Sequence, residues 1–102
     1  MVKTYVLSSR IGLAPLRFKG ETLTRVVGNG STITIFRTEP DRMCRQKYIV
    51  TDERRTANGR RTHVDVCQRG GEVAEILATV DPTLARAVLA SAGLPDPGVE
   101  TL

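Results

Sequence analysis

The sequence is poor in aromatic residues. Its 102 residues include no Trp, two Tyr and two Phe. A chain of this length forms one domain, and so few large rings predict a thin hydrophobic core. The hydrophobic fraction of 40% and the charged fraction of 25% are nevertheless typical of globular proteins and exclude bulk disorder. We expect a single domain over residues 1–102 that gains stability from a second copy of the chain.

Cysteine and histidine are too scarce for a structural metal site. Cys44 and Cys67 belong to no CxxC motif, and His63 is the single histidine, whereas a structural zinc ion needs four ligands. We therefore expect no metal and no cofactor. Free thiols are the expected state of both cysteines, and a disulfide is the alternative.

Long apolar runs are lacking as well. No stretch is long enough to cross a bilayer, and residues 1–7 have neither the apolar core nor the cleavage site of a signal peptide. We expect a soluble protein that has no membrane partner.

Motifs for catalysis are missing too. Asp65 and Glu53 could orient His63, but Cys67 would lie roughly 13 Å from it along a strand, too far for direct proton transfer. The Gly28-Asn29-Gly30-Ser31 stretch lacks the Lys-Ser/Thr of a phosphate-binding loop. The sequence favours a protein without catalytic residues and without a small-molecule substrate.

Residues 1–69 have the pattern of an antiparallel β meander. Apolar and polar residues alternate most clearly over residues 31–38, and turn residues occur at 28–30 and 57–59. Two strands at the start predict an N-terminal hairpin. The expected strands, about six in number, cover residues 3–9, 16–19, 21–27, 31–38, 45–54 and 60–69.

The register of the last two strands decides which side chains share a face. A two-residue Asn58-Gly59 loop would place Asp52 opposite Asp65, which is unfavourable. We therefore expect a three-residue loop over 57–59 with Gly59 left-handed, so that Val50 faces Val66. The face that carries Tyr48, Val50, Val64 and Val66 is then apolar. The opposite, open face carries Lys47, Ile49, Thr51, Arg55, Arg61, His63, Asp65 and Cys67.

Residues 70–94 predict a helical region. The apolar spacing indicates a helix over 72–80 and a second over 82–92, with Asp81 as N-cap, Pro82 at the first position and Gly93 at the end. A strand over 73–80 is the alternative. We expect an α+β fold in which both helices pack on one face of the sheet, followed by a loosely held tail over 95–102.

Charge is distributed unevenly along the chain. Residues 1–69 hold fourteen basic and six acidic side chains (+8), whereas residues 70–102 hold one basic and five acidic side chains (−4). Such asymmetry indicates a polyanion on one side, and arginines at a hairpin end can bind phosphate. A merely solvated basic surface is the alternative. The expected RNA-binding residues are Lys47, Thr51, Arg54, Arg55, Arg60, Arg61 and His63.

Four features together resemble the coat proteins of single-stranded RNA bacteriophages. They are residues 3–9, the strand 31–38 that runs into Thr38-Glu39-Pro40, the hairpin 48–68 with Asn58-Gly59, and the Ala-rich end 82–92. The resemblance implies interlocked homodimers whose sheets join, whose helices pack over the partner, and which assemble into an icosahedral shell. It also implies that the inner sheet face binds genomic RNA and an operator hairpin.

The resemblance therefore predicts a structural protein of a virion that is assembled in the bacterial cytoplasm. Its expected partners are further copies of itself and single-stranded RNA. The alternative is a small phage- or plasmid-encoded accessory protein that binds nucleic acid or inhibits a host complex.

Overall fold

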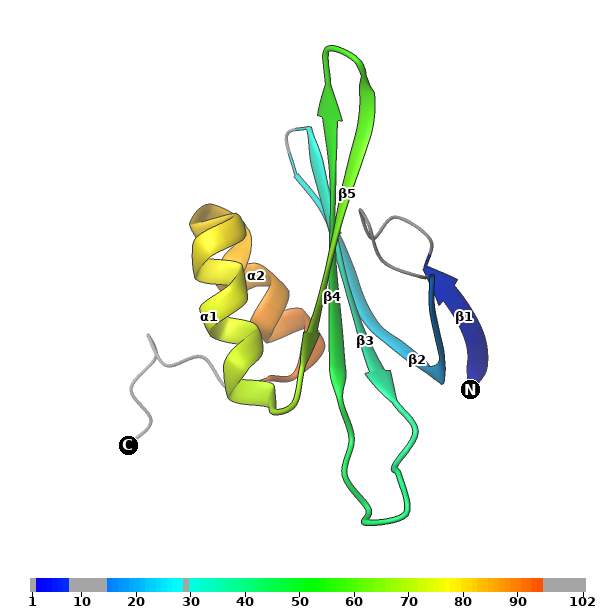
Figure 1. The fold of residues 1–102 in the computed structure, drawn as a ribbon. Helices are drawn as coiled ribbons and strands as arrows, with labels where there is room; N and C mark the ends of the chain where they lie inside the picture. Colours follow the sequence, from blue (N-terminus) through cyan, green and yellow to red (C-terminus); the bar gives the residue numbers. More distant parts are fainter. Residues whose placement is uncertain (1, 8–14, 29, 95–102) are drawn as a thin grey trace, which may run out of the picture.

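The computed structural model describes residues 2–7, 15–28 and 30–94. It confirms the α+β class, with an antiparallel meander followed by two helices (Figure 1). The elements are β1 (Lys3–Leu7), β2 (Leu16–Val27), β3 (Ser31–Thr38), β4 (Tyr48–Thr56), β5 (Gly59–Cys67), α1 (Gly70–Val80) and α2 (Pro82–Ala92). Three expectations fall outside the described residues: the end of the first strand at 8–9, Asn29 in the first turn, and the tail 95–102.

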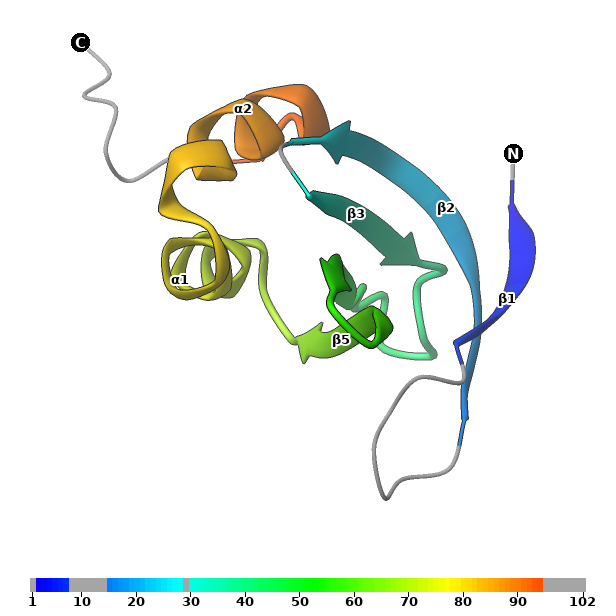
Figure 2. The same cartoon turned by 90° about the horizontal axis from the view of Figure 1, so that it is seen from above.

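The five strands form one sheet in the order β1-β2-β3-β4-β5. Every strand pairs antiparallel with its neighbour in the chain. Both helices lie on one side of the sheet, and β1 lies on the far side of β2 from them (Figure 2). β1 and β5 are therefore the edge strands of the sheet.

Among the described residues the sheet has five strands where about six were expected, because β2 continues through Gly20. A Cβ at this position would overlap the carbonyl oxygen of Arg37 on β3. The glycine thus marks a close approach between two backbones rather than a turn. The pairing with β3 shifts between Thr22 and Thr24, which lets the long strand bend.

The helices follow the sequence signals closely. The Asp81 side chain accepts a hydrogen bond from Leu84 N at 3.2 Å, and Pro82 stands at the first position of α2. Gly93 ends α2 in the left-handed conformation, at φ 70°. Residues 73–80 are helical, so the strand alternative is wrong, and α1 begins two residues before the expected start.

The core lies between the helices and the covered face of the sheet. It is largely aliphatic, and each Val, Leu or Ile side chain in it stabilises the fold by about 1.5–3 kcal/mol when fully buried. The buried residues are Ile33, Ile35, Val50 and Cys67 from the sheet, and Val73, Ala74, Leu77, Val88 and Leu89 from the helices. The helices of this chain thus cover its own sheet.

The other side of the sheet, here called the helix-free face, also has buried side chains. Tyr5, Phe18 and Phe36 form an aromatic cluster on it, with ring centroids 4.8–5.4 Å apart. Ile49 is 2% exposed and Thr51 4% exposed, although Ile49 is not a member of the helix-side core cluster. A hollow of about 200 Å³ is lined from both edge strands, by Leu7 of β1 and Val64 of β5 among others. The sheet therefore curves so that this face is concave.

The expected register of the β4–β5 hairpin is wrong by one residue. Val50 lies opposite Asp65 rather than Val66, and the loop consists of two residues, Ala57 and Asn58. Gly59 has a positive φ, as expected, but it belongs to β5. The slip moves every β5 side chain to the other face. Val64 and Val66 consequently lie on the helix-free face, whereas His63, Asp65 and Cys67 lie on the helix side.

Candidate nucleic-acid interface

Arginines from two separate parts of the chain meet at one end of the sheet. There the turn between β2 and β3 lies beside the β4–β5 hairpin, and the amide of Arg55 donates to the carbonyl of Gly30 at 2.9 Å. The pocket between them, here called the arginine pocket, has a volume of about 300 Å³. It is lined by Arg25, Val27, Gly28, Gly30, Ser31, Thr32, Glu53, Arg54, Arg55 and Arg60.

Three of these arginines belong to the helix-free face. Arg55 lies directly opposite Arg60, and Arg25 reaches the same face from β2. All three are exposed, and within the described part of the chain no ion pair involves them. Like charges this close repel each other, and a bound anion relieves the repulsion. The positive charge of these three guanidinium groups therefore favours an anionic ligand in the pocket.

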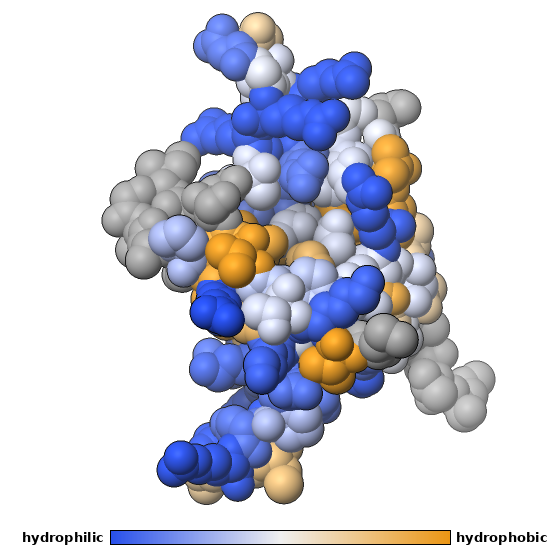
Figure 3. Space-filling view, turned by 90° about the vertical axis from the view of Figure 1, so that its right-hand side faces the viewer, coloured by the Kyte–Doolittle hydropathy of each residue, from blue (hydrophilic) through white to orange (hydrophobic). Residues whose placement is uncertain are grey.

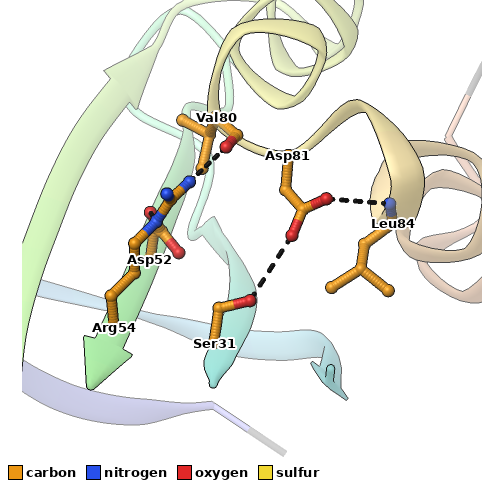
Figure 4. Close-up of polar contacts among 6 residues, drawn as sticks. All are labelled: Ser31, Asp52, Arg54, Val80, Asp81 and Leu84. Atoms are coloured by element: carbon orange, nitrogen blue, oxygen red, sulfur yellow. Dashed lines mark hydrogen bonds and ion pairs between the residues drawn. The ribbon is translucent and has the colours of Figure 1, made fainter. Parts of the chain in front are cut away.

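Arg54 has a different environment from its neighbour Arg55. Its Nε donates to Oδ2 of the buried Asp52 at 2.8 Å, and its Nη2 donates to the carbonyl oxygen of Val80 (Figure 4). Next to it, Ser31 Oγ donates to Asp81 at 3.4 Å. Arg54 thus fastens β4 to the end of α1, which gives it a structural role at the edge of the arginine pocket.

The seven predicted RNA-binding residues do not share one face. Arg54, Arg55 and Arg60 line the arginine pocket. Arg61 and His63 lie on the helix side, because the hairpin register differs from the expected one. Thr51 is buried, so its hydroxyl is not available to a ligand.

Lys47 lies away from the arginine pocket. It precedes β4, whereas the pocket arginines follow at the other end of this strand. Its amide donates to Thr38 Oγ1 at 2.9 Å. Its exposed side chain therefore lies at the opposite end of the sheet from the pocket arginines. The predicted basic residues do not cover a whole face, and only those at the β4–β5 hairpin end lie together.

Arg25 is the pocket residue that the sequence analysis missed. It is 30 residues away from Arg55 in the chain, so no local pattern connects the two. The predicted strand order contained the necessary information, because a turn at 28–30 brings residue 25 close to the start of the next strand. That strand in turn pairs with the first strand of the last hairpin, so the order of the strands places Arg25 near the β4–β5 hairpin.

The surface of the helix-free side is hydrophilic at both ends. Its upper end, formed by the β4–β5 hairpin, and its lower end are both strongly hydrophilic, whereas hydrophobic patches lie around the middle (Figure 3). The exposed apolar residues Val27 and Val66 contribute to this side of the sheet. The face thus combines two hydrophilic ends with a more apolar centre.

Within residues 2–7, 15–28 and 30–94, no three His, Cys, Asp or Glu side chains are grouped so that they could hold a metal ion. Neither helix of this described part is long and apolar enough to cross a membrane.

Comparison of the chain with protein-family models, with curated proteins and with solved structures gives no match.

Proposed function

We propose that this protein is a self-assembling, RNA-binding coat subunit of a small RNA phage, built into a virion in the bacterial cytoplasm. The arginine pocket is the observation that carries the RNA-binding part. Three exposed arginines, Arg25, Arg55 and Arg60, converge there without an ion-pair partner in the described part of the chain. Guanidinium groups bind phosphate oxygens in a bidentate manner, which suits a phosphodiester backbone.

The binding mode that follows is contact with phosphates rather than reading of bases. The aromatic rings of the helix-free face pack against one another, and Phe36 is 8% exposed, so stacking on single-stranded bases has little support. Phosphate contacts give affinity without sequence preference and a strong dependence on salt. Such binding suits the packaging of a long RNA.

The assembly part of the proposal is supported by the edge strand β5. It pairs with β4 alone within the described part of the chain, so one row of its backbone groups is free to pair with another strand. Pairing of β5 with β5 of a second copy would join the two sheets, as the resemblance to coat proteins implies. A closed two-fold contact of this kind is the commonest form of homodimer.

A second candidate is a small phage- or plasmid-encoded accessory protein that binds nucleic acid or inhibits a host complex and stays a monomer or dimer. The observation in its favour is the core, which the helices of the same chain close: Ile33, Val73, Leu77 and Val88 have no exposed surface. A shell is not needed to bury them. The size of the particle separates the two candidates.

The first experiment is size-exclusion chromatography with light scattering, together with the ratio of absorbance at 260 and 280 nm. A coat subunit gives a particle near the void volume that contains nucleic acid. A monomer or dimer without nucleic acid at moderate salt would contradict the coat proposal and favour the second candidate.

The second experiment tests the arginine pocket by RNA binding at several salt concentrations. The double variant Arg55→Gln/Arg60→Gln should bind single-stranded RNA at least about tenfold more weakly and reduce the salt slope by about 0.7 for each phosphate that is no longer neutralised. The matched control is Arg42→Gln/Arg45→Gln, which removes the same charge from the loop between β3 and β4. Equally weakened binding by both variants would show that net charge, and not the pocket, determines affinity.

A further inference from the structure

The edge strand β5 is long and regular. It has nine residues, pairs with β4 without a bulge, and contains neither proline nor lysine. From Gly59 to Val66 none of its residues is buried. Edge strands are usually short, bulged or guarded by such residues, because their free backbone groups otherwise pair with other strands. The outer edge of β5 is therefore open to pairing with another strand.

The backbone groups that point outward from this edge belong to alternate residues. The amide of Arg55 donates to the carbonyl of Gly30, so the odd-numbered residues of β4 bond to β3 and the even-numbered ones bond to β5. Each even-numbered residue of β4 lies opposite an odd-numbered residue of β5. The outward amide and carbonyl groups of β5 therefore belong to its even-numbered residues, which are Arg60, Thr62, Val64 and Val66.

A second copy of β5 can use all four of these residues if the two-fold axis passes through His63. In antiparallel pairing about this axis, Arg60 lies opposite Val66 of the partner subunit, and Thr62 lies opposite Val64 of the partner subunit. Outward groups then face outward groups along the whole edge. An axis between two residues is excluded, because it would pair outward groups with groups already bonded to β4.

Shifted registers satisfy fewer backbone groups. An axis through Val64 would place Arg60 opposite Gln68 of the partner subunit, and the amide of Gln68 already donates to Glu72 Oε2 at 2.9 Å. A shift in the other direction would place the last outward residue opposite the hairpin turn. The axis through His63 therefore gives the most hydrogen bonds between the two strands.

The same axis brings opposite charges together on the helix side of the sheet. Arg61 lies opposite Asp65 of the partner subunit, and the symmetry makes this contact twice. Within the described part of the chain neither side chain has an ion pair. Opposite charges directly across two strands are favourable. An axis through Val64 would instead place Arg61 opposite the buried Cys67 of the partner subunit.

We propose that two copies of the chain pair through β5 about an axis at His63, and that Arg61 and Asp65 of opposite copies determine this register. The proposal rests on the self-assembly in the proposed function and specifies its first contact. On the helix-free face the exposed Val66 then packs against the alkyl stem of Arg60 of the partner subunit. The joined sheet carries both arginine pockets on one face.

Disulfide cross-linking tests the register directly. In a Cys44→Ser background that keeps the buried Cys67, the variant His63→Cys places two thiols opposite each other in a non-hydrogen-bonded pair. The Cα atoms of such a pair are about 4.5 Å apart, which allows a disulfide. Val64→Cys is the matched control, because its two copies are out of line by two residues. We expect mild oxidation to cross-link the dimer of His63→Cys and not that of Val64→Cys.

Charge reversal tests the two residues that determine the register. Arg61→Asp and Asp65→Arg should each weaken dimerisation by about tenfold in sedimentation velocity, because each replaces two attractions by two repulsions. An equimolar mixture of the two variants restores both attractions in a heterodimer, so it should dimerise as the unmodified protein does. The control mixture combines Asp65→Arg with Arg42→Asp, which reverses a charge in the exposed loop between β3 and β4 and should restore nothing.

The outcomes separate this proposal from the proposed function. A dimer that cross-links through Val64→Cys, or a mixture of variants that does not recover, overturns the register and leaves the coat proposal in place. A protein that stays monomeric at every concentration overturns both the pairing and the self-assembly on which it rests. A dimer that cross-links through His63→Cys but forms no particle and binds no nucleic acid supports the pairing and contradicts the coat proposal.

Discussion

The two faces of the sheet are buried by different means. On the helix side, two amphipathic helices cover Ile33, Ile35 and Val50 with aliphatic side chains. On the helix-free face, Ile49 lies opposite Phe36 of the aromatic cluster and is buried without being a member of the helix-side core cluster. One face is thus covered by helices, as is usual in an α+β domain, whereas side chains on the other face are shielded from solvent by the curvature of the sheet.

This difference places neighbouring residues in unlike environments. Arg54 points to the helix side and fastens β4 to the end of α1, whereas Arg55 points to the helix-free face and lines the arginine pocket. Because side chains alternate along a strand, two arginines in succession serve structure and ligand binding separately. Sequence position alone therefore does not indicate which arginine has which role.

The strongest test of the comparison replaces one buried isoleucine on each face. Ile35→Ala and Ile49→Ala should each lower the free energy of unfolding by about 2–5 kcal/mol, since both side chains are almost completely buried. Urea denaturation measures both, with Val66→Ala, at a partly exposed position of the helix-free face, as the control. If Ile49→Ala costs no more than the control, the helix-free face is not a second core.

The two adjacent arginines provide the next test. Arg54→Gln should destabilise the protein by about 1 kcal/mol, because it leaves the carboxylate of Asp52 without its partner while the half-exposed guanidinium remains partly screened by water. Arg55→Gln should change stability by less than about 0.5 kcal/mol. For RNA affinity the order should reverse, with the larger decrease in Arg55→Gln. Equal effects in both measurements would remove the distinction between the faces.

The attachment of the helices to the sheet can be tested at Asp81, the residue between α1 and α2. Asp81→Ala should cost about 1 kcal/mol, because it removes the N-cap of α2. Ser31→Ala removes only the longer contact from β3 and should cost less than about 0.5 kcal/mol. Thermal unfolding followed by circular dichroism at 222 nm measures both. If Ser31→Ala lowers stability more than Asp81→Ala, the hydrogen bond between Ser31 and Asp81 matters more for this attachment than the N-cap of α2 does.

Cys67 gives the smallest effect and reports on the helix side alone. Burial, with help from nearby Glu72, Asp65 and Glu75, raises the pKa of its thiol from 9.0 to about 11. Above pH 9.0 the unfolded chain therefore loses this proton before the folded chain does, and stability falls as the pH rises towards 11.

Urea denaturation of the protein and of Cys67→Ala at increasing pH measures this dependence. The variant should show a weaker decrease above pH 9. In the folded protein a thiol reagent should label the exposed Cys44 and leave the buried Cys67 unmodified. Rapid labelling of both thiols would mean that the helices do not seal the covered face.

Local signals in the sequence were sufficient for the helices and for most strands. Asp81, Pro82 and Gly93 act within a few residues of their own position, so they placed both ends of α2 correctly. Gly20 was different, since its role depends on the carbonyl of Arg37 in the next strand. A glycine inside a strand could not be told from a turn before the pairing was known.

The register of the last hairpin was not predicted because only an Asn58-Gly59 loop and a loop over 57–59 were compared, whereas the observed loop is Ala57-Asn58 and places Asp52 opposite His63. The observed loop places Arg54 opposite Arg61 and Arg55 opposite Arg60. Arg54 is drawn away from Arg61 by Asp52 and Val80, so the repulsion within this pair costs little. This single slip explains why the expected basic face is split between both sides of the sheet.

The order of the strands also has a consequence for how the chain folds. Each strand pairs with the one made just before it, so the whole sheet can grow by successive hairpins between neighbouring segments of the chain. Contact between α2 and β2, exemplified by the hydroxyls of Ser91 and Thr24, instead joins residues far apart in the chain. We expect the sheet to form within microseconds to milliseconds and the docking of α2 to complete the native state last.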